Sequence, residues 1–264
     1  MEWLNNSLDL IKSRIIDGRE LNHDELVKMG IPERYAIEIE MAVDALINRI
    51  NFQRNGLFIV ISGIDKSGKE TQTFIGAPNV KPISVFLKEQ GHRVMDIIQP
   101  SYETLLGGLV KWYLSSGSLK KENAWILWVL DRAQHNKDIA KWLSEGGTVI
   151  AKRWTESNVV YQAAQGVNVD CILEAERNIV KQDITFILDI NVEEVLRRIN
   201  GKGDYYENID MLKKVRENYL KLKELYKFGK IVYIDANGPP VEVNNTLISI
   251  MKSYLAFLSD NQQI

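Results

Sequence analysis

A glycine-rich loop near residue 63 contains the residues whose spacing points most clearly to chemistry. Gly63 is followed by four residues and then by Gly68 and Lys69, which matches the Walker A pattern up to its last position. Glycines in this pattern let successive backbone N–H groups point into one concavity that holds phosphate oxygens. The helix expected next would add the positive end of its dipole, and Lys69 would reach the outer phosphates as a point charge. The sequence therefore predicts phosphate binding here; the alternative is a chance glycine turn with a surface lysine.

The last position of this pattern departs from what magnesium binding requires. Walker A needs Ser or Thr there as a magnesium ligand, but the chain has Glu70, and Thr71 comes one residue late. Glu70 is the candidate metal ligand, because carboxylate oxygens suit a hard cation. The sequence leaves open whether Mg²⁺ is bound in this way.

Short apolar runs, bounded by polar or glycine-containing segments, recur from residue 57 onward and alternate with longer helical patterns. Such alternation predicts the α/β class, with a five-stranded parallel sheet covered by helices on both faces. Because the first run leads directly into the glycine-rich loop, we expect a P-loop NTPase fold with its ligands beyond the carboxyl ends of the strands. The expected strands are Leu57–Ile61, Val94–Ile98, Thr148–Ala151, Ile184–Ile190 and Ile231–Ile234.

Residues 1–55 are expected to form a helical extension that precedes a main domain of residues 56–264. An apolar stripe recurs at helical spacing up to Asp17-Gly18, and Pro32 suits the first turn of a second helix. A helical hairpin of this size is too small to hold a core alone. It should therefore pack on the main domain or on a second subunit.

Composition and charge narrow the classes of partner. The chain has 264 residues, of which 45% are hydrophobic, and a formal net charge of −2. This balance gives no general footprint for nucleic acid or for an anionic membrane. No apolar stretch reaches the ~18–20 residues of a membrane span, and the N-terminus lacks a signal-peptide profile. We expect a cytoplasmic protein that binds small molecules and neither nucleic acid nor a membrane.

From Phe58 to about Leu255 the chain resembles the thymidylate kinase family. Ser62–Gln72 is similar to that family's phosphate loop, including the aspartate two residues after the first glycine. Further motifs follow in the family's order: Gly91-His92-Arg93, Leu106-Gly107 to Tyr113-Leu114, Ile126–Arg132, Lys152-Arg153-Trp154, Tyr161-Gln162 and Tyr206-Glu207-Asn208. The resemblance implies an enzyme, usually a homodimer, that transfers the γ-phosphate of ATP to the nucleotide dTMP with Mg²⁺.

The resemblance also implies an acceptor site built from five residues. Asp65 would meet the sugar 3′-hydroxyl, and Tyr161 would pack against the sugar. Trp128 would stack on the base, where an aromatic face contributes about 1–3 kcal/mol. Arg132 would contact the base edge and Arg153 the acceptor phosphate. Each role has a structural alternative: core packing for the two aromatic residues, and a solvated surface charge for the two arginines.

On the donor side, the resemblance implies that Lys69, Lys66 and Arg153 are catalytic cations, although Lys66 could instead be solvated. A segment around Gly201–Glu207 would close over the site, and Arg197 and Arg198 just upstream could approach the phosphates. The residues expected to bind ATP are Gly63, Asp65, Lys66, Ser67, Gly68, Lys69, Glu70 and Thr71.

Three departures from the family pattern concern the chemistry. Glu70 replaces the magnesium-binding hydroxyl, Lys152 replaces the aspartate of the family's Asp-Arg-Tyr, and Tyr102 replaces an arginine for the acceptor phosphate. The first two changes are reciprocal, so we expect an ion pair between Glu70 and Lys152 in place of the metal site. These changes keep two alternatives open: a non-catalytic nucleotide-binding protein, and a kinase for a different nucleotide.

Overall fold

The computed structural model describes residues 2–199 and 209–261 of the chain. Five strands form one parallel sheet in the spatial order β2-β3-β1-β4-β5. Every predicted strand is confirmed to within one residue at each end. The strands are β1 Leu57–Ser62, β2 Val94–Ile98, β3 Thr148–Lys152, β4 Ile184–Asp189 and β5 Lys230–Asp235.

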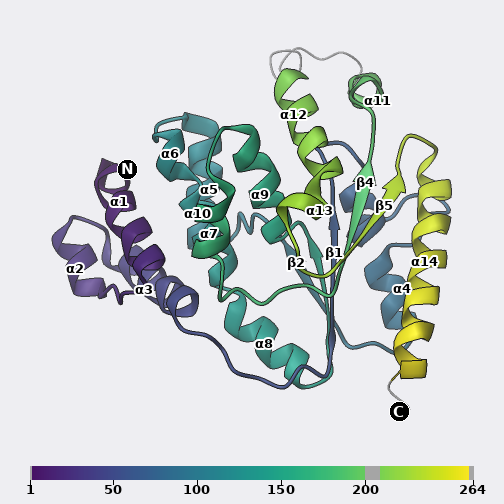
Figure 1. Ribbon diagram of the computed structural model, residues 1–264, viewed down its shortest axis with the longest axis horizontal. Coiled ribbons are helices and arrows are strands. Elements are labelled where there is room, and N and C mark those ends of the chain that lie inside the picture. Colours follow the sequence, from purple (N-terminus) through teal and green to yellow (C-terminus); the bar gives the residue numbers. More distant parts are fainter. Residues whose placement is uncertain (1, 200–208, 262–264) are drawn as a thin grey trace.

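Helices cover both faces of this sheet, as the alternating pattern predicts (Figure 1). All six residues of β1 are buried, which explains why this central strand is a continuous apolar run. The first three helices are α1 Glu2–Asp17, α2 His23–Lys28 and α3 Glu33–Ile47. The others are η1 Thr71–Ile75, α4 Ile83–Glu89, α5 Leu105–Ser116, α6 Lys121–Ala124, α7 Ile126–Ala133, α8 Asn136–Ser144, α9 Thr155–Ala164, α10 Val169–Ala175, α11 Val192–Arg198, α12 Ile209–Leu220, α13 Leu222–Leu225 and α14 Pro240–Asn261.

The N-terminal extension has three helices rather than the two of a hairpin. The additional helix α2 begins where the Asn22 side chain accepts a hydrogen bond from the Asp24 backbone N–H at 2.7 Å. The extension packs on the main domain: α1 lies against α6 and α10, and α3 against α5 and α7 (Figure 1). Leu4, Leu8 and other apolar residues of the extension belong to the same hydrophobic core as the sheet. The extension therefore adds a layer to the main domain's core.

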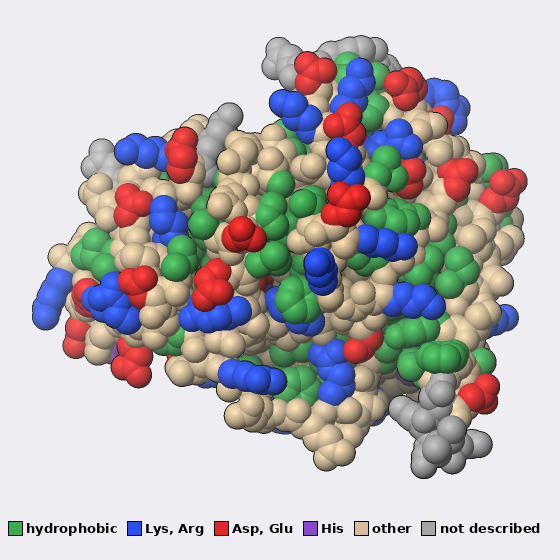
Figure 2. All heavy atoms as spheres, viewed as in Figure 1, with side chains coloured by type: hydrophobic (Ala, Val, Ile, Leu, Met, Phe, Trp, Pro, Cys, Tyr) green, Lys and Arg blue, Asp and Glu red, His purple; other side chains and the backbone are tan. Residues whose placement is uncertain are grey.

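The segment after the phosphate loop is not one continuous helix, and it contains Pro78 and Pro82, which break a helix interior. The helix η1 ends at Ile75, and the next residue, Gly76, has a φ of +74° in the left-handed region that favours glycine. A tight turn between Ala77 and Val80 then leads to α4. Among the described helices, none is both long and apolar enough to cross a membrane. On the face drawn in Figure 2, positive and negative side chains are interspersed, in agreement with the small net charge.

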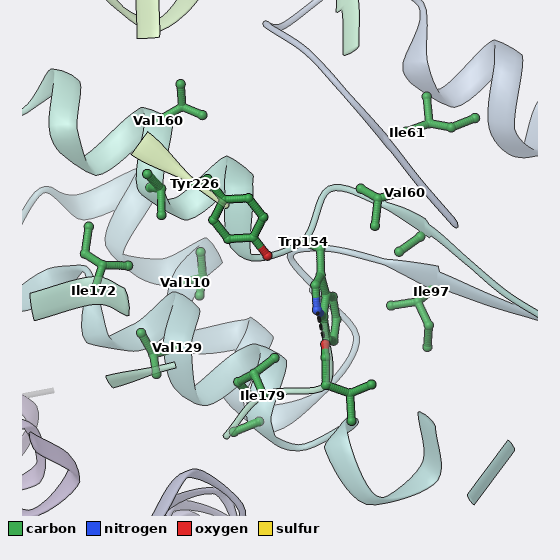
Figure 3. Packing of buried hydrophobic residues seen from close by; sticks show 14 of the residues in the cluster. Val60, Ile61, Ile97, Val110, Val129, Trp154, Val160, Ile172, Ile179 and Tyr226 are labelled. Carbon is green, nitrogen blue, oxygen red and sulfur yellow. Dashed lines mark hydrogen bonds between the residues drawn. The ribbon is translucent and has the colours of Figure 1, made fainter. Parts of the chain in front are cut away.

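A buried tryptophan fixes the chain where it leaves β3. Trp154 is fully buried, and its indole N–H donates to the Val180 carbonyl at 2.9 Å (Figure 3). Its ring also meets the Phe58 ring edge-on, with the centroids 5.2 Å apart. Burial and the indole hydrogen bond both restrict the Trp154 side chain. They therefore fix the backbone position of the preceding residue, Arg153, beside the phosphate loop.

Candidate functional site

A cavity of about 1560 Å³ lies at the carboxyl ends of the strands, where parallel α/β sheets bind ligands. The phosphate loop after β1 forms one wall, and the residues after β2, β3 and β5 contribute others. Side chains from α7 and α9 complete the cavity. All five residues expected at the acceptor site line it: Asp65, Trp128, Arg132, Arg153 and Tyr161.

The phosphate loop has the backbone that its glycines allow. Gly63 has φ +142°, and a Cβ there would come within 2.6 Å of the Leu188 carbonyl oxygen, so only glycine fits. Lys66 also has a positive φ of +63°, and Gly68 follows at +90°. Left-handed conformations of this kind turn neighbouring N–H groups toward one concavity.

Lys69 lies under the loop. Its Nζ donates to the Ile64 carbonyl at 2.5 Å and to Ser67 Oγ at 3.4 Å. Burial lowers the pKa of Lys69 well below its usual value, and the positive charge of Arg153 lowers it further. A phosphate group would oppose both effects by supplying negative charge, so the lysine is prepared for an anionic ligand.

The expected ion pair between Glu70 and Lys152 is confirmed. Lys152 Nζ donates to Glu70 Oε2 at 2.7 Å. The two side chains differ in burial: 15% of Lys152 is exposed against 49% of Glu70. The pair therefore places an ammonium at the end of β3, where the resemblance calls for a carboxylate.

This ion pair argues against the predicted role of Glu70 as a metal ligand. Magnesium requires octahedral oxygen ligands, usually one or two carboxylates, waters and substrate phosphates. The nearby carboxylates are both engaged by cations, Glu70 by Lys152 and Asp65 by Arg153. No group of three acidic, His or Cys residues suited to a metal occurs in the described part of the chain. The protein's own residues therefore do not fit a Mg²⁺ site here.

Arg153 is the centre of the polar contacts in the cavity. It donates to Asp65 Oδ1 at 2.5 Å, to Tyr161 OH at 2.9 Å and to Ser157 Oγ at 2.9 Å. Its guanidinium also lies 4.7 Å from the centroid of the Tyr161 ring. Burial raises the pKa of Asp65, but the charges of Arg153 and Lys69 outweigh it and lower that pKa below its usual value. The structure thus brings together four of the predicted residues, which are Asp65, Lys69, Arg153 and Tyr161.

A buried hydroxyl network lies behind Arg153. Tyr219 OH is 2.7 Å from Ser157 Oγ and 2.9 Å from Ser62 Oγ, which links α12, α9 and the end of β1. Tyr219 is buried, so these hydroxyls are shielded from water. The network joins the helix that carries Tyr161 to the strand that leads into the phosphate loop.

The acceptor side of the cavity combines aromatic and polar groups. Trp128 is half-buried and meets the Tyr113 ring edge-on, with the centroids 5.8 Å apart. Arg132 is only 2% exposed, and its Nε donates to Glu176 Oε1 at 3.0 Å. The alternative of a solvated arginine paired with its helix neighbour is therefore wrong. Arg132 is a buried cation neutralised by Glu176, which lies at the C-terminal end of α10.

Asn158 also lines the cavity, although it is not among the residues predicted from the sequence. Its Nδ2 donates to Glu176 Oε1 at 2.9 Å, while its buried Oδ1 accepts no hydrogen bond within the described part of the chain. A buried acceptor without a donor costs about 1–3 kcal/mol, which a ligand N–H would recover. Its spacing of one helical turn before Tyr161-Gln162 could have revealed it, because these residues share a face of α9.

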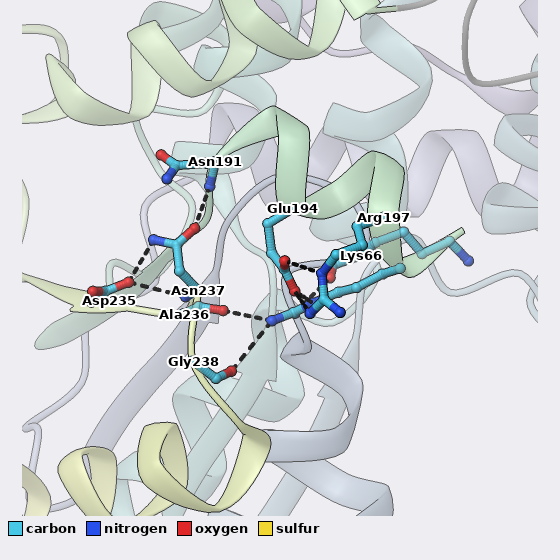
Figure 4. A network of polar contacts seen from close by, with 9 residues as sticks. Lys66, Asn191, Glu194, Arg197, Asp235, Ala236, Asn237 and Gly238 are labelled. Atoms are coloured by element: carbon cyan, nitrogen blue, oxygen red, sulfur yellow. Dashed lines mark hydrogen bonds and ion pairs between the residues drawn. The ribbon is translucent and has the colours of Figure 1, made fainter. Parts of the chain in front are cut away.

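A second polar group connects α11 with the loop after β5 (Figure 4). Arg198 donates to the Ala236 carbonyl at 2.8 Å and to the Lys66 carbonyl at 3.2 Å. Arg197 and Arg198 both pair with Glu194, and 76% of the Arg197 side chain is exposed. Arg198 thus approaches the phosphate loop through a backbone contact. The expected closing segment at 201–207 lies outside the described residues.

Comparison with known proteins identifies the group to which these features belong. A family model described as thymidylate kinase matches residues 61–248. A probable thymidylate kinase of Methanocaldococcus jannaschii is 33% identical over 202 residues, which cover 75% of this chain and 97% of that protein. One from Thermococcus kodakarensis is 32% identical over 212 residues, which cover 75% of this chain and 98% of that protein.

A solved structure agrees with the fold. The thymidylate kinase of Candida albicans has a TM-score of 0.62 and 24% sequence identity, and the match covers 76% of this chain and 93% of that one. At this identity, the likeness supports the fold. The family match begins at residue 61, after the helical extension.

Proposed function

The chain belongs to the thymidylate kinase family, and from this premise we propose that it transfers the γ-phosphoryl group of ATP to dTMP, giving dTDP and ADP. One observation carries the proposal. A single cavity joins the phosphate loop to a pocket that offers an aromatic face, a buried arginine and an unpaired amide oxygen. The loop suits ATP, and the pocket suits a pyrimidine nucleotide.

The acceptor pocket matches the hydrogen-bonding edge of thymine. Thymine presents an N3–H donor between two carbonyl acceptors. Asn158 Oδ1 is the buried acceptor for the N3–H, and Arg132 has N–H groups beyond the two that contact Glu176. Trp128 lines the same pocket and offers a ring face to the base.

Transfer requires an acceptor phosphate oxygen to attack the γ-phosphorus while the bond to the β,γ-bridging oxygen breaks and ADP leaves. Negative charge spreads over the transferred group, and fixed cations stabilise it. Lys69 and Lys152 lie on the donor side of the cavity, and Arg153 lies on the acceptor side. Arg153 would exchange Asp65 for the acceptor phosphate, which frees that carboxylate for the sugar 3′-hydroxyl.

In the family, Mg²⁺ supplies further charge neutralisation on the ATP phosphates. Since the residues near Glu70 offer it no protein site, Lys152 provides fixed positive charge at the end of β3 instead. We further propose that the protein is cytoplasmic and a homodimer, as the family resemblance implies. Light scattering on the purified chain measures the number of subunits directly.

The test is an ADP-release assay with ATP, Mg²⁺ and dTMP. We expect dTMP-dependent turnover that falls about 10²- to 10³-fold in Lys69→Ala, because a preorganised cation is lost. The matched control is Lys213→Ala, which removes an exposed lysine of α12. Turnover that does not depend on dTMP, or that is equal in Lys69→Ala and the unsubstituted chain, would contradict the proposal. A panel of other nucleotides in place of dTMP tests acceptor identity.

A further inference from the structure

A second cavity, of about 750 Å³, lies where the helical extension joins the main domain. One side is the linker between α3 and β1, residues 49–54, and the other is the loop between α10 and β4, residues 177–181. None of its lining residues lines the cavity at the phosphate loop. The linker also precedes residue 61, where the family match begins. The cavity is thus separate from the site described above.

The lining of this cavity has one sign of charge. It contains Arg49, Arg54, Arg177 and Lys181, and no Asp or Glu. The other polar lining groups are side-chain amides, those of Asn51, Gln53 and Asn178. Four cations that converge on one cavity attract a ligand with several negative charges.

Three of these cations are held in place by contacts with the surrounding chain. Arg54 donates to Asp183 Oδ1 at 2.6 Å and to the Lys181 carbonyl at 2.6 Å. Arg177 donates to the Ile15 carbonyl in α1 at 3.1 Å. Lys181 donates to the Glu176 carbonyl at 2.6 Å. Cations fixed before a ligand arrives lose little conformational entropy on binding it.

Two of the cations have no carboxylate within ion-pair distance. Arg54 pairs with Asp183 and Arg177 with Glu174, whereas Arg49 and Lys181 form no ion pair within residues 2–199 and 209–261. Burial lowers the pKa of Lys181 to about 8, although the negative charge of Glu176 raises it in part. Its hydrogen bond goes to a neutral carbonyl, so an anion in the cavity would supply a charged partner.

We propose that this cavity binds a small polyphosphate, and that a nucleoside 5′-polyphosphate fits it best. The volume lies within the range of small-molecule sites and is too large for a single phosphate. Phe52 and Ile50, both half-buried, give the lining an apolar part on which a base can rest. Phe52 lies beside Arg54, whose guanidinium is 6.0 Å from the ring centroid, so the lining offers an aromatic ring next to the cations for a molecule that carries both phosphates and a base.

The experiment measures ATP binding by calorimetry to the full chain carrying Lys69→Ala, which weakens the phosphate loop. We expect ATP and inorganic tripolyphosphate to bind and adenosine not to bind. Adding Arg49→Glu should weaken ATP binding at least about tenfold, since it reverses an exposed charge at the cavity. The matched control is Lys214→Glu, an exposed reversal on α12.

Lys181→Gln provides a second variant, because glutamine keeps a side-chain N–H donor while lacking the charge. It should weaken binding in the same way, with an unchanged circular dichroism spectrum. Undetectable ATP binding, or equal binding in the Arg49→Glu and Lys214→Glu proteins, would overturn the proposal. Kinase activity does not enter this measurement, so its outcome is independent of the function proposed above.

Discussion

Lys152 Nζ lies 2.7 Å from Glu70 Oε2, and this contact joins the last residue of β3 to the first turn after the phosphate loop. In the family pattern these positions hold an aspartate and a hydroxyl residue that serve magnesium. Here the two residues neutralise each other. The chain has therefore replaced a place for a divalent cation by an internal ammonium.

This replacement predicts a changed response to magnesium. At saturating MgATP, we expect the unsubstituted chain to show little further activation by free Mg²⁺, because the Glu70 carboxylate is paired with Lys152. The double variant Glu70→Ser/Lys152→Asp restores the family's residue types and should gain a free-Mg²⁺ requirement. Initial rates over a range of free Mg²⁺ give the comparison, and identical curves for the two proteins would contradict it.

Glu70→Gln alone should lower the free energy of unfolding by less than about 1 kcal/mol, because the pair is partly exposed.

The buried pair of Arg132 and Glu176 predicts a large stability effect. Their side chains are 2% and 0% exposed, so removing the carboxylate leaves a buried uncompensated charge. We expect Glu176→Ala to lower the free energy of unfolding by about 3–5 kcal/mol, measured by chemical denaturation. Glu176→Gln should lose less, since its carbonyl still accepts from Arg132. A loss below about 1 kcal/mol in the alanine variant would show that the pair is not buried in solution.

A companion variant separates structure from recognition at this pair. Arg132→Met/Glu176→Leu replaces both charges by apolar groups, which is often neutral for stability. We expect a smaller loss of stability than in Glu176→Ala, although Asn158 Nδ2 also loses its acceptor, and a raised KM for dTMP because the base loses its donor. An unchanged KM would remove Arg132 from the acceptor site.

The unpaired oxygen of Asn158 predicts a specificity effect. Cytosine has an acceptor at N3 where thymine has an N–H, so it would face Asn158 Oδ1 acceptor to acceptor. We expect Asn158→Ala to reduce the preference for dTMP over dCMP by about tenfold or more, measured as the ratio of kcat/KM values. Gln165→Ala, at the edge of the same cavity, is the matched control. Equal ratios in the two variants would count against contact between Asn158 and the base.

Asp131 predicts a pH dependence of stability. Burial raises its pKa to about 7, although the Ser101 backbone N–H lowers it in part. Because the folded pKa lies above the unfolded value, the folded state holds more protons between about pH 4 and 7. Stability from this group is complete below pH 4 and is lost as the pH rises through 7, with a slope of at most about 1.4 kcal/mol per pH unit.

The variant Asp131→Asn tests this assignment, because its amide does not titrate. We expect its thermal midpoint to depend less on pH between 5 and 8 than that of the unsubstituted chain. Asp260→Asn, an exposed change on α14, should leave the profile as it was. A parallel pair of profiles for Asp131→Asn and the unsubstituted chain would contradict the shift.

The sequence by itself determined the sheet, the phosphate loop and one long-range contact. Each strand is an apolar run whose burial follows from its own residues, and the loop is a local pattern of glycines. The contact between Glu70 and Lys152, 82 positions apart, was predictable because both changes fall on motif positions known to adjoin. Apolar runs and motifs can be recognised in the sequence without knowledge of the packing.

Only the tertiary structure decided which partners complete the acceptor site. Glu176 belongs to no recognisable motif, yet it neutralises Arg132, which lies 44 positions away in the sequence. Asp65 likewise contacts Arg153, which lies 88 positions away. The packing of α1 and α3 against the main domain likewise decides that the extension shares the main hydrophobic core. The same packing forms the basic cavity between the two. The physical reason is that burial and pairing of these groups depend on neighbours brought together by the whole chain, which no local spacing encodes.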